Sequence, residues 1–326
     1  MQIAVVVLCT FVLALVFGKL LIPALRALKA GQSIREIGPS WHNSKAGTPT
    51  MGGIMFIAAA VLCVVAAGWR SMAAGYRTHL YVLAFALVFG LIGFLDDFVK
   101  VKYKRNLGLT ALQKLVLQLA AAAAYLALLR HNGDLTCDLY IPFWNVTFYI
   151  SWPVYLIFAI FVIVGCVNAV NLTDGVDGLS SSVTIPVMAF FAACAFLWGK
   201  TTLALLPASL VGGLAAFLVY NHHPAKVFMG DTGSLFLGAA VCGLAFALDM
   251  PLILILVGFV YICETLSVIL QVTYFKLTHG KRIFKMTPIH HHFELCGWSE
   301  NKIVAVFAAV TVLLCVLAFL GVMGRY

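Results

Sequence analysis

Charged residues are scarce in this sequence. Asp, Glu, Lys and Arg together make up 10% of the 326 residues, whereas hydrophobic residues make up 63%. Soluble globular domains carry about 25% charged residues, so this composition excludes an ordinary soluble domain. The nine cysteines are scattered and form no CxxC pair, which argues against a disulfide framework and against a zinc–thiolate site. We therefore expect an integral membrane protein.

Apolar runs long enough to cross a bilayer recur along the whole sequence. A spanning helix needs about 20 mainly apolar residues. The runs predict an all-α polytopic membrane protein with about ten transmembrane helices, at roughly 3–25, 51–69, 78–95, 109–129, 152–170, 180–198, 202–220, 232–248, 251–275 and 303–324. The first run lacks a basic n-region and a cleavage site, which indicates a retained span. Because the loops are short, we expect residues 1–326 to form a single integral membrane domain.

The basic residues are distributed unevenly between the two sides of these runs. Cytoplasmic loops of membrane proteins carry an excess of Lys and Arg. Most basic residues here follow odd-numbered runs, and the other side holds only Arg70, Arg77, Arg130, Lys200 and Arg325. This bias predicts that both termini lie outside and that the odd-numbered loops are cytoplasmic. It also accounts for the net charge of +9 as a membrane signal that includes attraction to anionic lipid, so we expect no nucleic-acid binding.

One predicted outside loop, residues 131–151, differs from the other outside loops, which are short and plain. It is rich in Thr, Tyr, Phe and Val and contains a central PFWN turn at residues 142–145. This pattern is typical of a small β-hairpin, and its aromatic residues suit the membrane interface. We assign this segment a structural role.

The few acidic residues gather at the ends of apolar runs. Of the 12 in the chain, five lie at three such places on the predicted cytoplasmic side: Asp96, Asp97, Asp174, Asp177 and Asp231. Ionisable groups are costly at the membrane and usually mark a substrate or ion path, and clustered carboxylates favour a hard cation such as Mg²⁺. Each place also has a purely structural interpretation, namely a solvated helix end after residue 95, a helix cap and turn at 174–178, and a helix N-cap at Asp231.

Other polar residues lie in the same predicted cytoplasmic loops. Several Lys and Arg residues follow Asp97 closely and could hold a phosphate. His290, His291 and His292 are consecutive, and a zinc site normally uses spaced ligands, so they fit either hydrogen bonding to phosphates or a solvated loop. Together with the acids, these groups predict metal-assisted phosphoryl transfer at the membrane surface, with the active site on the cytoplasmic face.

Five segments of the sequence resemble a known family. They are HNSKAGTPTMGG (42–53), FLDDFVKVKYKRN (94–106), NAVNLTDGVDGLS (168–180), NHHPAKVFMGDTGS (221–234) and MTPIHHHFELCGWSE (286–300). The set resembles the polyprenyl-phosphate N-acetylhexosamine-1-phosphate transferase superfamily over essentially the whole chain. The first and last segments resemble its phospho-N-acetylmuramoyl-pentapeptide transferase branch.

The resemblance implies a reaction and its location. The substrates would be UDP-MurNAc-pentapeptide and undecaprenyl phosphate, the products lipid I and UMP, and the cofactor Mg²⁺. This is the first membrane step of peptidoglycan synthesis, carried out in the bacterial cell membrane. A homodimer is a further expectation that rests on the resemblance alone.

Matching the family's motifs to this sequence implies roles for individual residues. Asp231 would be the main Mg²⁺ ligand, with Asp174 and Asp177 at the nucleotide and metal site. One member of the Asp96–Asp97 pair would deprotonate the lipid phosphate, and His290 would be the essential histidine. The residues implied in substrate binding are Lys45, Lys100, Lys104, Lys114, Asn171, Asp174, Gly175, Asp177, Asn221, Phe228, His291 and His292, with Phe228 stacking on uracil.

Two rival functions fit part of the same pattern. A sibling transferase that moves GlcNAc-1-phosphate to the same lipid would share most motifs, but TPTMGG in the first loop and HHHFE argue against it. A cation or lipid transporter would place its acids near mid-span, whereas here only Glu264 lies well inside a run. Two chemical routes also stay open: direct attack by the lipid phosphate, and a two-step route through a phosphorylated aspartate. We favour direct attack, because a phosphate monoester with a second pKa of about 6 is already largely ionised near neutral pH.

Overall fold

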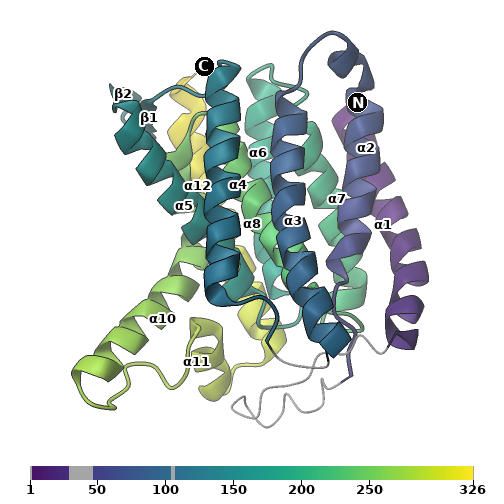
Figure 1. Cartoon of the computed structure of the whole chain (residues 1–326), viewed down its shortest axis with the longest axis vertical. Helices are drawn as coiled ribbons and strands as arrows, with labels where there is room; N and C mark the ends of the chain where they lie inside the picture. Colours follow the sequence, from purple (N-terminus) through teal and green to yellow (C-terminus); the bar gives the residue numbers. More distant parts are fainter. Residues whose placement is uncertain (1, 29–46, 104–106, 326) are drawn as a thin grey trace.

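The computed structural model describes residues 2–28, 47–103 and 107–325, and these are almost entirely helical (Figure 1). The helices are α1 (Gln2–Ala27), α2 (Gly53–Ala73), α3 (Thr78–Tyr103), α4 (Ala111–His131), α5 (Trp152–Thr173), α6 (Leu179–Leu197), α7 (Leu205–Asn221), α8 (Gly230–Ala247), η2 (Pro251–Ile253), α9 (Leu254–Val257), α10 (Phe259–Leu277), α11 (Ile289–Leu295), α12 (Glu300–Val322) and η3 (Met323–Arg325). Two strands, β1 (Asp138–Ile141) and β2 (Val146–Tyr149), complete the described chain.

Within the described ranges, nine helices are long and apolar enough to cross a membrane. The all-α polytopic architecture expected from the sequence is therefore confirmed. All ten predicted spans are helical in the structure, but α7 has only 17 residues and is shorter than a usual span. The predicted span at 251–275 is not one helix, because the chain turns through η2 and α9 before α10 begins after Gly258.

Helix α8 lies at the centre of the bundle (Figure 1). It packs mainly against α3 and α5, and 89% of its membrane-crossing window is buried. Its sequence, GDTGSLFLGAAVCGLAFA, has apolar or small residues on every face, which is the pattern of a helix surrounded by protein. Asp231 is in the first turn of this helix, so the central position of α8 brings a carboxylate to the end of the bundle axis.

Helices α3 and α8 pack closely at Gly93. A Cβ atom added there would overlap the backbone carbonyl of Asp231 and the amide of Thr232. The absence of a side chain on Gly93 therefore sets the spacing between the two helices that carry the acidic residues.

A methyl group at this contact should destabilise the bundle. We expect Gly93→Ala to lower the free energy of unfolding by about 1–3 kcal/mol, the usual cost of overpacking, measured as a fall in the thermal midpoint of the purified protein. Gly165→Ala on α5 is the matched control, because nothing lies within 4 Å of its added Cβ. The control should be neutral or slightly stabilising. An equal midpoint for both variants would contradict the close packing at Gly93.

The predicted hairpin is confirmed. Strands β1 and β2 pair antiparallel from Asp138 opposite Tyr149 to Ile141 opposite Val146, and residues 142–145 form the turn. The backbone N–H of Phe143 donates to the carbonyl of Gly321 at 2.8 Å, which fastens the turn to the end of α12. Both chain ends lie at the hairpin end of the bundle, and α11 lies at the opposite end (Figure 1).

Helix α10 leans away from the bundle axis (Figure 1). Its buried residues are Val260, Tyr261, Glu264, Ser267 and Gln271, which recur at helical spacing and so form one stripe. Most of this stripe is polar. The side chain of Gln271, which belongs to this stripe, accepts hydrogen bonds from the backbone N–H groups of Ile283 and Phe284, at 3.0 and 2.9 Å. The polar stripe of α10 thus holds the segment that leads to α11.

Candidate active site

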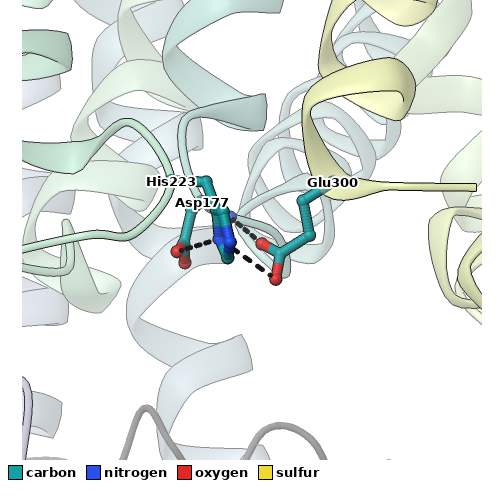
Figure 2. A group of neighbouring side chains, drawn as sticks. All are labelled: Asp177, His223 and Glu300. Carbon is teal, nitrogen blue, oxygen red and sulfur yellow. Dashed lines mark hydrogen bonds and ion pairs between the residues drawn. The ribbon is translucent and has the colours of Figure 1, made fainter.

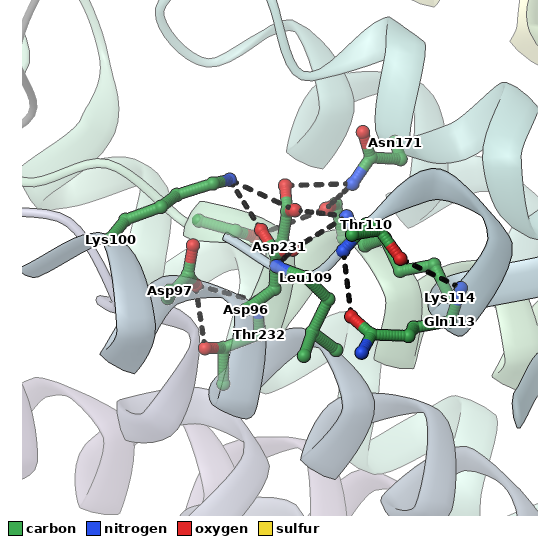
Figure 3. A network of polar contacts seen from close by, with 12 residues as sticks. Asp96, Asp97, Lys100, Leu109, Thr110, Gln113, Lys114, Asn171, Asp231 and Thr232 are labelled. Carbon is green, nitrogen blue, oxygen red and sulfur yellow. Dashed lines mark hydrogen bonds and ion pairs between the residues drawn. The ribbon is translucent and has the colours of Figure 1, made fainter. Parts of the chain in front are cut away.

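Three carboxylates meet at the end of the bundle opposite the hairpin. Asp96 and Asp97 belong to the last turns of α3, and Asp231 belongs to the first turn of α8. One oxygen from each lies within 4.8 Å of the others. Asp96 and Asp97 are only 2% and 3% exposed. The structure therefore brings the DD pair and the MGD aspartate, far apart in sequence, into one acidic cluster (Figure 3).

Two lysines partly neutralise this acidic cluster. Nζ of Lys100 lies 2.6 Å from Asp96 and 3.2 Å from Asp231. Nζ of Lys114, from α4, lies 2.6 Å from Asp231 and 3.5 Å from Asp96. Three carboxylates so close together repel one another, and each lysine bridges two of them. Lys100 and Lys114 were both predicted from the sequence, and the structure places both in the cluster (Figure 3).

A capping box positions Lys114. The hydroxyl of Thr110 accepts from the N–H of Gln113, and the Gln113 side chain accepts from the N–H of Thr110, so α4 begins at a fixed point. The preceding N–H, of Leu109, donates to Asp96 at 2.8 Å. We did not predict this contact, although the Thr-x-x-Gln pattern was a sequence signal for the helix start.

Asp97 stabilises the start of α8. Its Oδ2 accepts from the backbone N–H of Thr232 at 2.9 Å and from the Thr232 hydroxyl at 2.7 Å. The alternative that Asp231 is a simple N-cap is wrong, because Met229 is the N-cap residue and makes no side-chain cap bond. The cap is supplied across the helix interface by Asp97, which leaves the Asp231 carboxylate for the lysines.

Asn171 and Asp174 approach the cluster from the end of α5. The Asn171 amide donates to Oδ1 of Asp231 and to the hydroxyl of Ser234, both at 3.0 Å (Figure 3). Asp174 is the C-cap residue, directly after the last residue of α5. The loss of water around its carboxylate, followed by repulsion from Asp231 and Asp97, raises the pKa of Asp174 well above its usual value. Asp174 therefore lies in the electrostatic field of the cluster.

Asp177 belongs to a second group of side chains. The segment between Asp174 and Asp177 is a turn, so they do not share a helix face. Nδ1 of His223 lies 3.1 Å from Asp177 and 3.4 Å from Glu300 (Figure 2). Glu300 also accepts from the N–H of Asp177 at 3.2 Å, and Asp177 accepts from the N–H of Ala225 at 3.1 Å. This group ties the 174–178 turn to the α7–α8 loop and to the start of α12.

The segment before α8 is fixed by main-chain hydrogen bonds. The N–H of Phe228 donates to the carbonyl of Pro49 at 2.8 Å, and the carbonyl of Phe228 accepts from Gly52 at 2.9 Å. Asn221 accepts from the N–H of Gly178 at 3.0 Å and donates to the carbonyl of Val227 at 2.9 Å. Asn221 thus shapes two turns of the site, and Phe228 stands partly exposed between them. Their implied contacts with uridine stay predictions.

The three histidines lie on a short helix, α11, and not in an extended loop. Each has a different environment. Nδ1 of His290 lies 3.0 Å from Glu264, and Nδ1 of His291 lies 2.6 Å from Glu294. Nδ1 of His292 accepts from the N–H of Lys285 at 3.2 Å. Two of the predicted site residues, Lys45 and Lys104, fall outside the described ranges.

The acidic cluster fits a hard divalent cation. Its donors are carboxylate oxygens alone, the ligands that Mg²⁺ prefers, with no thiolate or imidazole among them. The two lysines leave its negative charge incompletely balanced. The structure groups Asp231 with Asp96 and Asp97, whereas Asp177 is engaged by His223 and Glu300. The metal set of Asp174, Asp177 and Asp231 stays a prediction.

Sequence reasoning missed several residues of the site. His223, Thr232, Ser234 and Glu300 make contacts that join segments distant in the chain. His223 and Glu300 did lie within the two motifs we singled out, at 221–234 and 286–300. No periodic pattern in the sequence signals which partner each would find.

Comparisons with known proteins agree with these motifs. The model of glycosyl transferase family 4 matches residues 79–249, and signature 1 of phospho-N-acetylmuramoyl-pentapeptide-transferase matches residues 45–57. The phospho-N-acetylmuramoyl-pentapeptide-transferase of Clostridium acetobutylicum is 48% identical over 317 residues, which cover 97% of each chain. The proteins of the same name from Clostridium novyi and Alkaliphilus metalliredigens are 46% and 47% identical, and they cover 97% and 98% of this chain and 95% and 98% of their own. The chain belongs to the phospho-N-acetylmuramoyl-pentapeptide-transferase family.

Proposed function

We propose that this protein transfers phospho-MurNAc-pentapeptide from UDP-MurNAc-pentapeptide to undecaprenyl phosphate, with Mg²⁺ as cofactor. The products are lipid I and UMP. The observation that carries the proposal is the buried cluster of Asp96, Asp97 and Asp231, bridged by Lys100 and Lys114 at one end of a membrane bundle. Such a cluster suits a reaction between a lipid phosphate and a nucleotide diphosphate, and membership of the family supports the named substrates.

In the proposed reaction a lipid phosphate oxygen forms a bond to the sugar-linked phosphorus. The bond from that phosphorus to the UMP oxygen breaks, and UMP leaves with the electron pair. Mg²⁺ held by Asp231 with its carboxylate neighbours would neutralise phosphate oxygens. Lys100 and Lys114 both lie beside Asp231. Their positive charges would stabilise the negative charge that develops on the leaving UMP oxygen.

Direct attack needs little help from a base. A phosphate monoester has a second pKa of about 6 and is largely ionised at neutral pH. Asp96 is already held by both lysines and by the N–H of Leu109, and Asp97 is held by Thr232. These contacts suit carboxylates that organise the site, and they support direct attack over a phosphorylated aspartate.

UMP release by the purified protein tests the proposed function. With undecaprenyl phosphate and UDP-MurNAc-pentapeptide we expect Mg²⁺-dependent UMP and a new lipid product. Release with UDP-GlcNAc in place of the pentapeptide donor would transfer the chain to the sibling activity. If neither donor gave UMP, the proposed transferase function would be wrong and the transporter hypothesis would be favoured.

Truncation of Phe228 should weaken donor binding. Its ring is partly exposed between two fixed turns, and stacking on a base is worth about 1–3 kcal/mol. We expect Phe228→Ala to raise the donor KM by about 5- to 150-fold with a smaller change in kcat. Phe161→Ala is the control, since Phe161 is 76% exposed on the outer face of α5. An unchanged donor KM in Phe228→Ala would contradict stacking.

We further propose that the acidic cluster faces the cytoplasm and that both termini lie outside. The basic residues support this orientation through the excess that follows odd-numbered spans. A reporter fused to the C-terminus should be active only outside the cytoplasm, and cytoplasmic reporter activity would invert the topology. We also propose a homodimer, on the family alone, to be checked by cross-linking in membranes.

A further inference from the structure

A carboxylate lies inside the bundle with no place in the mechanism above. Glu264 belongs to the polar stripe of α10 and is 0% exposed. A buried carboxylate is costly unless it is paired and hydrogen-bonded. Its Oε2 lies 3.0 Å from Nδ1 of His290, and the backbone N–H of His290 points at the same oxygen from 3.5 Å. Glu264 thus holds both the ring and the main chain of one residue of α11.

The two nitrogens of the His290 ring have different surroundings. An ionised Glu264 only accepts hydrogen bonds, so in that pairing Nδ1 of His290 is the donor. Nε2 is buried, and no described residue is its hydrogen-bond partner. Leaving a buried polar atom unpaired costs about 1–3 kcal/mol. Because Nε2 of His290 lies at the end of the molecule that holds the acidic cluster, we expect it to find its hydrogen-bond partner in a bound ligand or water.

Gly175 packs directly against Nε2. Gly175 is exposed, whereas His290 is buried. A Cβ atom at Gly175 would overlap Nε2 and Cε1 of His290, so the ring fits here only because residue 175 has no side chain. Gly175 directly follows Asp174, whose carboxylate lies in the field of Asp231 and Asp97. Nε2 is therefore directed at the turn that borders the acidic cluster.

We propose that Glu264 is a positioning residue: it fixes the His290 ring through Nδ1, so that Nε2 is held for a hydrogen bond to the sugar-nucleotide donor. The proposal rests on the transferase function proposed above. This role accounts for Glu264, which lies well inside a predicted span, without the ion path that the transporter hypothesis requires. It also explains why His290 differs from its neighbours, since His291 pairs with Glu294 on its own helix and His292 with the main chain of Lys285.

Steady-state kinetics of two variants test the positioning role. Glu264→Gln keeps the shape and an accepting oxygen, whereas Glu264→Leu removes the acceptor. We expect kcat to fall by about 10-fold in Glu264→Gln and about 100-fold in Glu264→Leu, the range for carboxylates that orient functional histidines. The donor KM should rise by less than about 3-fold, because a hydrogen bond that strengthens as charge develops on the donor lowers kcat more than it raises KM when it is lost. Ser267→Ala, on the same stripe and bonded only to the carbonyl of Glu264, should retain wild-type kcat.

A double variant separates positioning from general support of the fold. In a His290→Asn background, Glu264→Leu should lower kcat by less than about 2-fold, because Glu264 acts through the histidine. An equal loss with and without His290, or wild-type kcat in Glu264→Leu, would overturn the proposal. If Glu264→Leu cannot be purified, the isosteric Glu264→Gln variant decides in the same two backgrounds.

A spectroscopic measurement keeps this inference separate from the proposed function. In protein labelled with ¹⁵N-histidine, the signal of His290, assigned by its loss in His290→Asn, should show a protonated Nδ1. Glu264→Leu should reduce that protonation. A bare Nδ1 in the wild-type protein would refute the pairing whether or not the protein is an active transferase. A protonated Nδ1 in a protein that releases no UMP would contradict the proposed function and leave only the pairing of Glu264 with His290 in place.

Discussion

Replacing Asp231 with asparagine is expected to lower kcat by about 10³-fold or more, equivalent to about 4 kcal/mol of lost transition-state stabilisation. Asp231 joins three elements: it lies 2.6 Å from Lys114 of α4 and 3.2 Å from Lys100 of α3, and it accepts from Asn171 of α5 at 3.0 Å. Asparagine keeps the shape but removes the charge. Both lysines would then turn to Asp96, and the cluster would lose the ligand best placed for Mg²⁺.

The control for Asp231→Asn is Asp249→Asn at the other end of the bundle. Asp249 is also a partly buried carboxylate with a basic neighbour, 3.8 Å from Arg325, and its φ of 58° suits asparagine. We expect the control to keep kcat within about 2-fold. Ordinary turnover by Asp231→Asn, in protein that remains folded by thermal unfolding, would remove Asp231 from the chemistry.

Removal of divalent cations should abolish turnover as completely as the Asp231 substitution does. We expect a chelator to reduce UMP release to background and Mg²⁺ to restore it. The reason is electrostatic: two lysines face three carboxylates, and an incoming diphosphate and lipid phosphate add more negative charge. Without a cation, the substrates and the cluster repel each other.

Cation binding can also be measured without turnover. Paramagnetic Mn²⁺, another oxygen-preferring ion, should bind the wild-type protein and be displaced by Mg²⁺. Its affinity should fall at least about 10-fold in Asp231→Asn and remain unchanged in Asp249→Asn. Full activity in the chelator, or equal Mn²⁺ binding by all three proteins, would contradict a metal at the acidic cluster.

Hydrophobic length and local turn chemistry made the architecture predictable. A run of about 20 apolar residues forms a spanning helix in nearly every case. The Thr, Tyr, Phe and Val residues around PFWN indicated the hairpin. The break at Gly258 escaped prediction because the flanking residues are equally apolar on both sides. In the structure, α9 packs against α12 and η2 packs against β1, contacts for which the sequence carries no local signal.

The site was predictable as a set of residues but not as a set of pairs. Motifs indicated that Asp96, Asp97, Lys100, Lys114 and Asp231 belong together, and the structure brings them together. Asp177 is paired with Glu300, which is 123 residues away from it in the chain. Glu264 and His290, which lie on different helices, are likewise 26 residues apart in the chain. Such contacts are decided by tertiary packing, for which a single sequence carries no periodic signal.

The central helix has a consequence for how the protein is assembled. Among the helices that could cross the membrane in the described chain, α8 is the most buried and one of the least hydrophobic. A segment enters lipid from the translocation machinery according to its own hydrophobicity, so α8 is poorly suited to enter alone. Its main neighbours, α3 and α5, precede it in the sequence and are complete before α8 is synthesised. The order of the helices along the chain therefore provides α8 with a protein surface to enter, and Asp231 reaches its place only when that surface exists.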